Sequence, residues 1–220
     1  MARKRAEVAF QTRTRLLTAT AKLIAKNGYD ATSVEDIAAE AGYTHGAIYR
    51  HFDSKETLFL ESVSAYIGPR LTLLFERLES IQSLDEQVAY LAHHFYERSE
   101  KDPDWILLEN EFWLFAMRRP HLRPQVEELY GKLRPFYTIF ELPEWRRRAR
   151  RLGVETGDLI SIISAMIDGL TRQQYATPDD VDLEFVQMSL RAILGMRRTV
   201  PAHLQPDSDQ SAGADQSAKE

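Results

Sequence analysis

Apolar residues recur at α-helical spacing along most of the chain. Between positions 12 and 27 they mark one helical face, with Leu16, Leu17, Ala21, Leu23 and Ile24. The same spacing predicts further helices over 55–80, 83–101, 104–118, 121–140, 155–175 and 182–196. No segment alternates apolar and polar residues over the length of a convincing strand. The pattern therefore predicts an all-α fold.

A short helix is expected from Val34 to Ala41, between two clear boundary signals. Thr32 and Ser33 are both suitable N-caps. Glu35 follows Thr32 by three positions, which is the spacing of a capping box. Gly42 stops the helix, since glycine readily adopts the left-handed conformation found after helix ends.

A second short helix is expected from its N-cap Thr44 through Phe52. Small and apolar residues can pack it against the preceding helix: Val34, Ile37, Ala38, Ala41, Ile48 and Phe52. This is the spacing of a helix-turn-helix motif. The second helix of such a pair enters the DNA major groove and presents its N-terminal side chains to base edges.

The predicted DNA contacts divide into base readers and phosphate contacts. Thr44, His45, Ala47 and Arg50 are expected to face the bases, whereas Tyr49 and Lys55 are placed to meet phosphates. For His51, packing and capping beneath Tyr49 is the alternative role. The full predicted DNA-binding set is Thr32, Ser33, Thr44, His45, Gly46, Ala47, Tyr49, Arg50, His51 and Lys55.

Residues 15–60 closely resemble the DNA-binding region of the TetR family of transcriptional regulators. The shared residues are Leu16-Leu17, Ala21, Gly28-Tyr29, Ala31-Thr32, Asp36-Ile37-Ala38, Ala41-Gly42, Gly46, Tyr49, His51-Phe52, Lys55-Glu56 and Leu58. Tyr43-Thr44 stands where the family usually has Val-Ser. The resemblance implies an all-helical homodimer, in which the first three helices and the start of the fourth bind DNA and the remaining helices surround a ligand cavity. It also implies that the last two helices pair with their copies.

This organisation predicts three regions. Residues 1–54 form the helix-turn-helix DNA-binding domain, ordered from about residue 10. Residues 55–198 form a larger helical effector-binding and dimerisation domain. Residues 199–220 are rich in Pro, Ser, Asp, Gln and Ala, and are expected to be a disordered tail because they offer almost nothing to bury.

The last two predicted helices carry apolar residues on more than one face. A terminal helix this apolar would leave a large exposed patch on a monomer. The expected dimer interface comprises Leu159, Ile163, Met166, Leu170, Phe185, Met188 and Ile193. The alternative is that both helices are buried entirely within one subunit.

Aromatic residues are dense between positions 95 and 140, and each alone is most simply part of the core. Together they suit a cavity for an apolar or aromatic small molecule held by a few polar anchors. Predicted effector-binding residues are Trp105, Asn110, Trp113, Tyr137, Phe140, Met166, Asp168 and Gln174. Asp168 is equally consistent with a structural role, and Glu111 with a carboxylate that packs helices together.

The formal net charge of −5 conceals a difference between regions. Residues 1–60 contain nine basic and seven acidic side chains, a net charge of +2. Whole-chain charge therefore does not argue against a local phosphate-binding face. The chain has no cysteine and no apolar run of about 20 residues, and its basic N-terminus lacks the apolar stretch of a signal peptide. We expect a cytoplasmic protein without membrane contact.

The run from Trp145 to Arg151 contains five arginines. Its simplest interpretation is a solvated helix surface or loop; a second DNA contact or attraction of an anionic effector are the alternatives.

Motifs that would indicate an enzyme are absent, including G-x-S-x-G, H-E-x-x-H and a phosphate-binding glycine loop. His93 and His94 are adjacent and point to different faces of their helix, so no metal site and no cofactor are expected. The sequence predicts a repressor that a small-molecule effector releases from a palindromic operator. Alternatives are a regulator without effector, an activator, or an enzyme or carrier that contains a helix-turn-helix.

Overall fold

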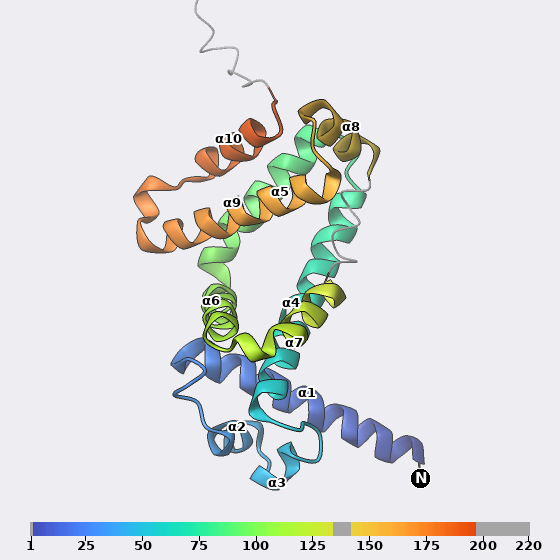
Figure 1. The fold of residues 1–220 in the computed structure, drawn as a ribbon, viewed down its shortest axis with the longest axis vertical. Helices are drawn as coiled ribbons and strands as arrows, with labels where there is room; N and C mark the ends of the chain where they lie inside the picture. Colours follow the sequence, from blue (N-terminus) through green and yellow to red (C-terminus); the bar gives the residue numbers. More distant parts are fainter. Residues whose placement is uncertain (1, 134–141, 197–220) are drawn as a thin grey trace, which may run out of the picture.

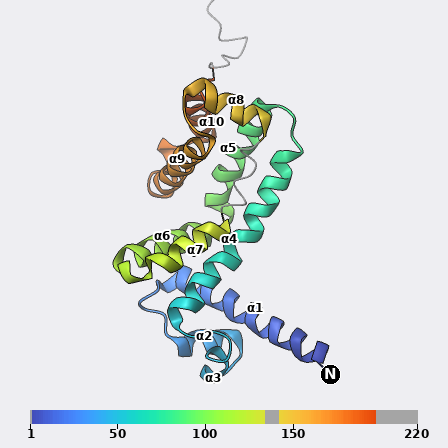
Figure 2. The ribbon, with the colours of Figure 1, turned by 45° about the vertical axis from the view of Figure 1, so that its right-hand side comes forward.

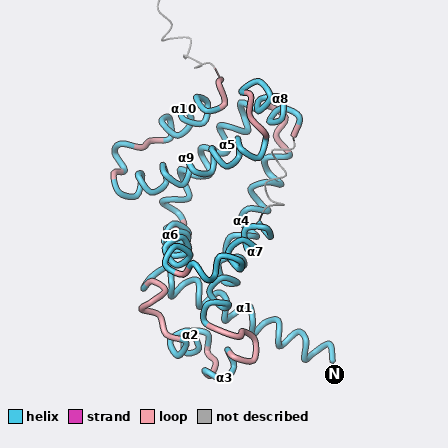
Figure 3. The backbone as a smooth tube through the Cα atoms, viewed as in Figure 1, coloured by secondary structure: helices cyan, strands magenta, loops and turns pink. Residues whose placement is uncertain are grey.

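The computed structural model describes residues 2–133 and 142–196, which form helices and no strand (Figures 1 and 3). This confirms the all-α prediction. In chain order the elements are α1 Ala2–Asn27, α2 Val34–Ala41, α3 His45–Ile48, α4 Lys55–Glu79, α5 Leu84–Lys101, α6 Pro103–Arg118, the 3-10 turn η1 Pro120–Leu122, α7 Arg123–Leu133, α8 Pro143–Leu152, α9 Thr156–Ala176, the 3-10 turn η3 Pro178–Asp180 and α10 Leu183–Ile193. Within the described ranges, no helix combines the length and apolar character needed to cross a membrane.

The molecule is elongated, with the N-terminal helices at one end and the C-terminal helices at the other (Figures 1 and 2). Helices α1, α2 and α3 form the lower end in Figure 1. Helix α4 rises from them to the upper end, where α5, α8, α9 and α10 gather. Helices α6 and α7 lie between the two ends, so α6 is placed to connect them.

Three apolar clusters hold this arrangement together. The first joins α1 to α4 and contains Leu16, Leu17, Ala19, Val34, Ile37, Ala38, Ile48, Phe52 and Leu58. The second joins the end of α1 to α4, α6 and α7, and the third joins α4, α5, α8, α9 and α10. Because Leu58 belongs to the first cluster, the N-terminal core extends one turn into α4.

The boundaries of α2 follow from local hydrogen bonds. The Ser33 hydroxyl accepts a hydrogen bond from the Asp36 N–H, and the Asp36 carboxylate accepts one from the Ser33 N–H. The donor–acceptor distance is 3.0 Å in both. The capping box is therefore Ser33–Asp36, and the predicted pairing of Thr32 with Glu35 is wrong. Gly42 closes the helix at φ 75°, with its N–H directed at the preceding carbonyls.

Two other boundaries differ from prediction. Helix α1 begins at Ala2 rather than near residue 12, which adds almost three exposed turns. Helix α3 ends at Ile48 rather than Phe52. Past Ile48 the N–H groups of His51 and Phe52 both donate to the carbonyl of Ile48, each at a distance of 2.9 Å, and residues 49–51 form a turn. Of the predicted helix 121–140, positions 134–141 lie outside the described residues.

The arginine run forms helix α8. Trp145 and Ala149 are buried on its inner face, whereas Arg146, Arg147, Arg150 and Arg151 are exposed. The interpretation as a solvated helix surface is confirmed. The Trp145 indole N–H donates to Gln87 Oε1 over 2.7 Å, and the Gln87 amide donates to the carbonyls of Leu78 and Ile81. Trp145 thereby ties α8 to the α4–α5 connection.

The predicted dimer residues on α9 and α10 fall into two groups. Leu159 and Ile163 are 1% and 2% exposed and lie in the subunit's own core, so their assignment to a dimer surface is wrong. Met166, Leu170 and Ile193 are half-buried against the same core. Phe185 and Met188 are 38% and 39% exposed, and the unpredicted Ile162 is 47% exposed. The large apolar side chains that the described parts of α9 and α10 expose are Ile162, Tyr175, Phe185 and Met188.

Candidate nucleic-acid interface

Helix α3 and the turn after it are presented to solvent by a rigid base. Ile48 and Phe52 are 0% and 2% exposed and fix α3 against α1, α2 and the start of α4. On the outer side Thr44, His45, Gly46, Tyr49 and Arg50 are exposed, and Ala47 is half-buried. The structure thus brings six of the ten predicted DNA-binding residues to one surface.

The chemistry on this surface suits base and phosphate contacts. Thr44 is the N-cap of α3, but its hydroxyl makes no capping hydrogen bond. His45 Nε2 lies 3.2 Å from Glu35 Oε1, and the His45 ring centroid lies 4.9 Å from that of Tyr49. Contacts with α2 and Tyr49 therefore orient the imidazole. Such preorientation reduces the entropy lost when a side chain meets its partner.

The other four predicted residues occupy different settings. Thr32 is 1% exposed, and its hydroxyl donates to the carbonyl of Gly28 over 2.8 Å, so the structure assigns it to packing. Ser33 caps α2. His51 is half-buried, with its ring centroid 6.4 Å from that of Phe52. Lys55 Nζ donates to the Tyr29 carbonyl over 2.7 Å and lies 4.1 Å from the Tyr29 ring centroid, so its ammonium already has partners.

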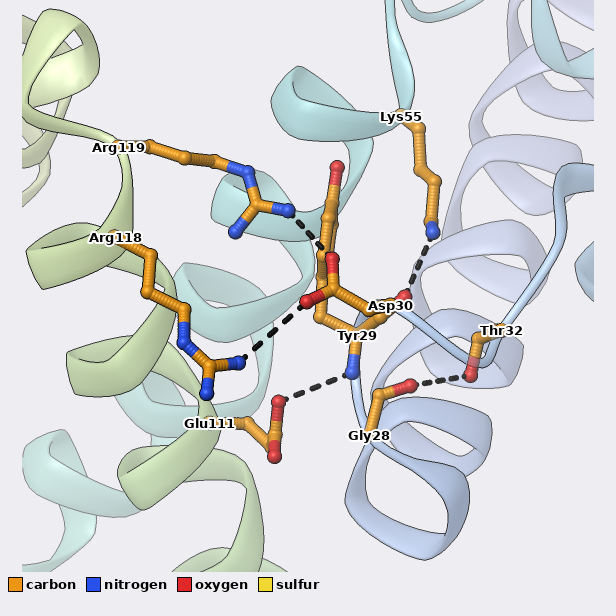
Figure 4. Close-up of polar contacts among 8 residues, drawn as sticks. All are labelled: Gly28, Tyr29, Asp30, Thr32, Lys55, Glu111, Arg118 and Arg119. Carbon is orange, nitrogen blue, oxygen red and sulfur yellow. Dashed lines mark hydrogen bonds and ion pairs between the residues drawn. The ribbon is translucent and has the colours of Figure 1, made fainter.

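Tyr29 lies at the junction between the DNA-binding helices and α6 (Figure 4). Its ring is 4% exposed and packs against Phe59 and Phe115, with centroids 5.1 and 4.6 Å away. Its N–H donates to Glu111 Oε2 on α6 over 3.0 Å. This confirms the interpretation of Glu111 as a helix-packing carboxylate.

Two arginines at the end of α6 reach the same segment (Figure 4). Arg119 Nη2 lies 2.5 Å from Asp30 Oδ1, and Arg118 Nη1 lies 3.6 Å from Asp30 Oδ2. The Arg119 guanidinium also lies 4.6 Å from the Tyr29 ring centroid. The segment that leads into α2 is therefore held directly by the end of α6. Sequence reasoning missed this Asp30–Arg119 pair, because 89 residues separate its members and no local signal links them.

Comparisons with known proteins agree with this geometry. The family described as "Bacterial regulatory proteins, tetR family" matches residues 16–62, which extend from α1 through the helix-turn-helix into α4. An uncharacterized HTH-type transcriptional regulator of Bacillus subtilis, YwcC, is 27% identical over 170 residues, covering 70% of this chain and 71% of that protein. Residues 16–62 of the chain are therefore similar to the DNA-binding region of the TetR family. The resemblance deduced from residues 15–60 is confirmed.

Solved structures of other regulators show the same fold over nearly their whole length. A regulator from Streptomyces coelicolor, SCO7518, superposes with a TM-score of 0.64 at 25% identity, covering 84% of this chain and 98% of that one. FadR from Bacillus subtilis, solved in complex with stearoyl-CoA, superposes with a TM-score of 0.62 at 21% identity. The match covers 82% of this chain and 96% of FadR. Several other curated relatives match over only 54 to 61 residues, so the chain spans 19% to 31% of their length.

The predicted effector residues do not all come together in one site. Trp105 is buried beside the Arg98 guanidinium, which also interacts with the charge of Asp168. Asn110 Oδ1 accepts a hydrogen bond from Arg172 at a distance of 3.3 Å. Gln174 is buried elsewhere and donates to the Tyr96 carbonyl over 3.3 Å. Trp113 packs in the second apolar cluster and Met166 in the third. Tyr137 and Phe140 lie outside the described residues. Gln174 also lines a cavity of about 10 Å³, which holds at most one water.

A buried charged cluster between α5, α6 and α9 was not predicted. The Arg98 guanidinium lies 4.1 Å from the Trp105 ring centroid and 4.6 Å from that of Phe95. Its buried Nε–H and the Trp105 Nε1–H have no hydrogen-bond acceptor among the described residues, although the indole lies close to the Glu109 carboxylate. Glu109, Asp168 and Asp102 provide opposite charge around Arg98. The available signal was Glu109, one of the few carboxylates within the largely apolar sequence of α6.

The raised pKa of Glu109 predicts that the stability of the folded protein depends on pH. Burial raises this pKa above its ordinary value of 4.5, and the Asp168 charge raises it further, whereas Arg98 opposes the shift. The folded state therefore binds more protons than the unfolded state between pH 4.5 and the raised pKa, and stability falls as pH rises through that window. Glu109→Gln, which mimics the protonated form, is expected to raise the melting temperature at pH values above the window and to change it little below. Thermal melts across the window test this, with the exposed Glu100→Gln as control; an equal shift at all pH values contradicts it.

Proposed function

We propose that the protein is a sequence-specific DNA-binding repressor that acts in the cytoplasm as a homodimer and is released from its operator by a small molecule. The observation that carries the DNA-binding role is an exposed row on α3 and its flanking residues, Thr44, His45, Tyr49 and Arg50. Buried Ile48 and Phe52 fix this segment. Residues 1–54 form the DNA-binding domain in this proposal, and residues 55–198 form the effector and dimerisation domain.

Helices α9 and α10 are the proposed dimer interface. Ile162, Phe185 and Met188 are exposed on these two helices, at the far end of the molecule from α3. An isologous pairing would place two copies of α3 about a two-fold axis. The operator is then a palindrome with half-sites about 34–36 Å apart or somewhat more.

The effector is proposed to act through the helices around Trp105 and Arg98. FadR from Bacillus subtilis, which has a similar fold, was solved in complex with stearoyl-CoA, and this supports a small-molecule effector. A ligand that displaces α6 would move Glu111 and Arg119, and these hold Tyr29 and Asp30 at the entrance to the helix-turn-helix. The change in DNA affinity cannot exceed the ligand's difference in affinity for the two arrangements.

Selection from a pool of random duplexes tests this function. The purified protein is incubated with the pool, and the bound fraction is sequenced over several rounds. We expect enrichment of one palindromic motif, with the centres of its half-sites about one helical turn apart or more. Enrichment of no motif, or of an asymmetric single site, contradicts the proposal.

A further inference from the structure

The first turns of α1 project beyond the N-terminal core (Figures 1 and 2). Residues 3 to 11 are all exposed, and Thr12, which follows them, is buried. Tertiary packing normally supplies most of a helix's stability. These turns have little packing in the isolated subunit, which suggests that they contact something else.

The exposed turns form one wall of a groove, and the helix-turn-helix forms the other. From α1 the groove is lined by Lys4, Arg5, Val8, Ala9 and Thr12; from the helix-turn-helix it is lined by Tyr43, Ala47, Arg50 and His51. Its volume is about 600 Å³. Ala47 and Arg50 also belong to the surface that is expected to face DNA, so the groove continues that surface.

The charge of the groove is uniformly positive. Lys4, Arg5 and Arg50 line it, whereas no aspartate or glutamate does. Glu7, the one acid in the first three turns of α1, accepts a hydrogen bond from Gln11 instead. None of the three cations forms an ion pair within the described part of the chain. Clustered cations without partners favour an anionic ligand.

The position of these cations in the helix is unfavourable for the subunit alone. Arg3, Lys4 and Arg5 lie at the N-terminus of α1, whose first turn contains no acid. The helix dipole is positive at this end and disfavours cations there. Arginine and lysine in these positions therefore lower the stability of α1, which argues that they serve a ligand.

We propose that this groove binds the sugar–phosphate backbone of the DNA strand that flanks the bases read by α3. The proposal rests on the DNA-binding function above. From Lys4 to Thr12 the helix rises about 12 Å, which equals the approximate width of the major groove. The α1 wall is thus long enough to extend from α3 to an adjacent strand. In both views α1 points away from α9 and α10, so the contacted strand lies on the outer flank of each half-site.

The double variant Lys4→Ala/Arg5→Ala tests the proposal against two duplexes. One contains the selected palindrome with additional base pairs on both sides, and the other ends at its outer base pairs. For each duplex, the dissociation constant is measured by fluorescence anisotropy over a range of salt concentrations. On the long duplex the variant is expected to bind roughly tenfold more weakly. The slope of log Kd against log salt concentration (the salt slope) should decrease by about 2 for each subunit's pair of contacts. On the short duplex the variant and the native protein are expected to bind alike.

The matched control is Arg150→Ala/Arg151→Ala, which removes the same charge from exposed positions on α8, at the opposite end of the molecule. An equal loss in this control would attribute the effect to net charge and overturn the proposal. So would an unchanged salt slope in the α1 variant. The melting temperature of the α1 variant should equal or exceed that of the native protein; a lower value with equal losses on both duplexes also overturns it. If the native protein selects no motif at all, the failure is that of the DNA-binding function.

Discussion

Replacement of both Phe185 and Met188 by glutamate is expected to convert a dimer into a monomer and to weaken binding to a palindromic duplex by about 10²–10⁴-fold. These side chains are 38% and 39% exposed on α10, and Ile162 is 47% exposed on the neighbouring helix α9. Burial of these side chains against a second copy removes apolar surface from water. Two carboxylates on each copy would have to be desolvated and would repel their symmetry mates.

The loss of DNA affinity follows from the loss of linkage between two half-sites. When the first α3 of a dimer binds, the second is held near its own half-site at high effective concentration. A monomer lacks this advantage, so its affinity falls although every contact with one half-site persists.

Sedimentation velocity and fluorescence anisotropy test this prediction together. The control is Leu73→Glu, at a position 66% exposed on α4, where an added carboxylate is expected to leave both mass and affinity unchanged. A Phe185→Glu/Met188→Glu variant that still sediments as a dimer would contradict the proposed interface. If it sediments as a monomer yet binds the palindrome as tightly as the native protein, the link between dimerisation and DNA binding is contradicted.

Trp145→Ala is expected to lower the free energy of unfolding by about 3–5 kcal/mol. The side chain is 1% exposed, and its removal leaves a cavity between α8 and the α4–α5 connection. The substitution also removes the donor to Gln87 Oε1, which lies 2.7 Å from the indole nitrogen. An unsatisfied buried acceptor adds to the cost of the cavity.

Urea unfolding followed by far-UV circular dichroism measures this loss. The Trp145→Phe variant keeps most of the volume and removes only the N–H donor, so about 1–3 kcal/mol is expected. The difference between the two variants isolates the cavity. A Trp145→Ala protein within about 1 kcal/mol of the native one would contradict the role of this side chain, since cavities of this size cost more.

The helix-turn-helix could be predicted from sequence because its signals are local. The backbone at position 42 is left-handed, which favours glycine, and the spacing of Ile37, Ile48 and Phe52 identifies the packed faces. The N-cap was ambiguous, since Thr32 and Ser33 each precede an acid by three positions. Burial of Thr32 settles it, and burial depends on contacts that local spacing does not contain.

The C-terminal helices were less predictable for a related reason. Apolar periodicity identifies a face of a helix but not what covers it. Leu159 and Ile163 face the subunit's own core, whereas Ile162 between them is exposed. Similarly, Arg98 and Glu109 come from different helices, and only the packing of α5 against α6 places their charges together. A carboxylate in a largely apolar helix indicates a buried partner, but the sequence does not identify which residue that partner is.

The central claim is that the α3 surface reads base sequence, and a ratio of two affinities tests it most directly. The dissociation constant is measured for the motif enriched by selection and for a shuffled duplex of identical composition, at one near-physiological salt concentration. The claim predicts that the native protein binds the motif at least about 10³-fold more tightly. It also predicts that His45→Ala narrows this ratio chiefly by weakening binding to the motif. Equal affinity for both duplexes would contradict the claim.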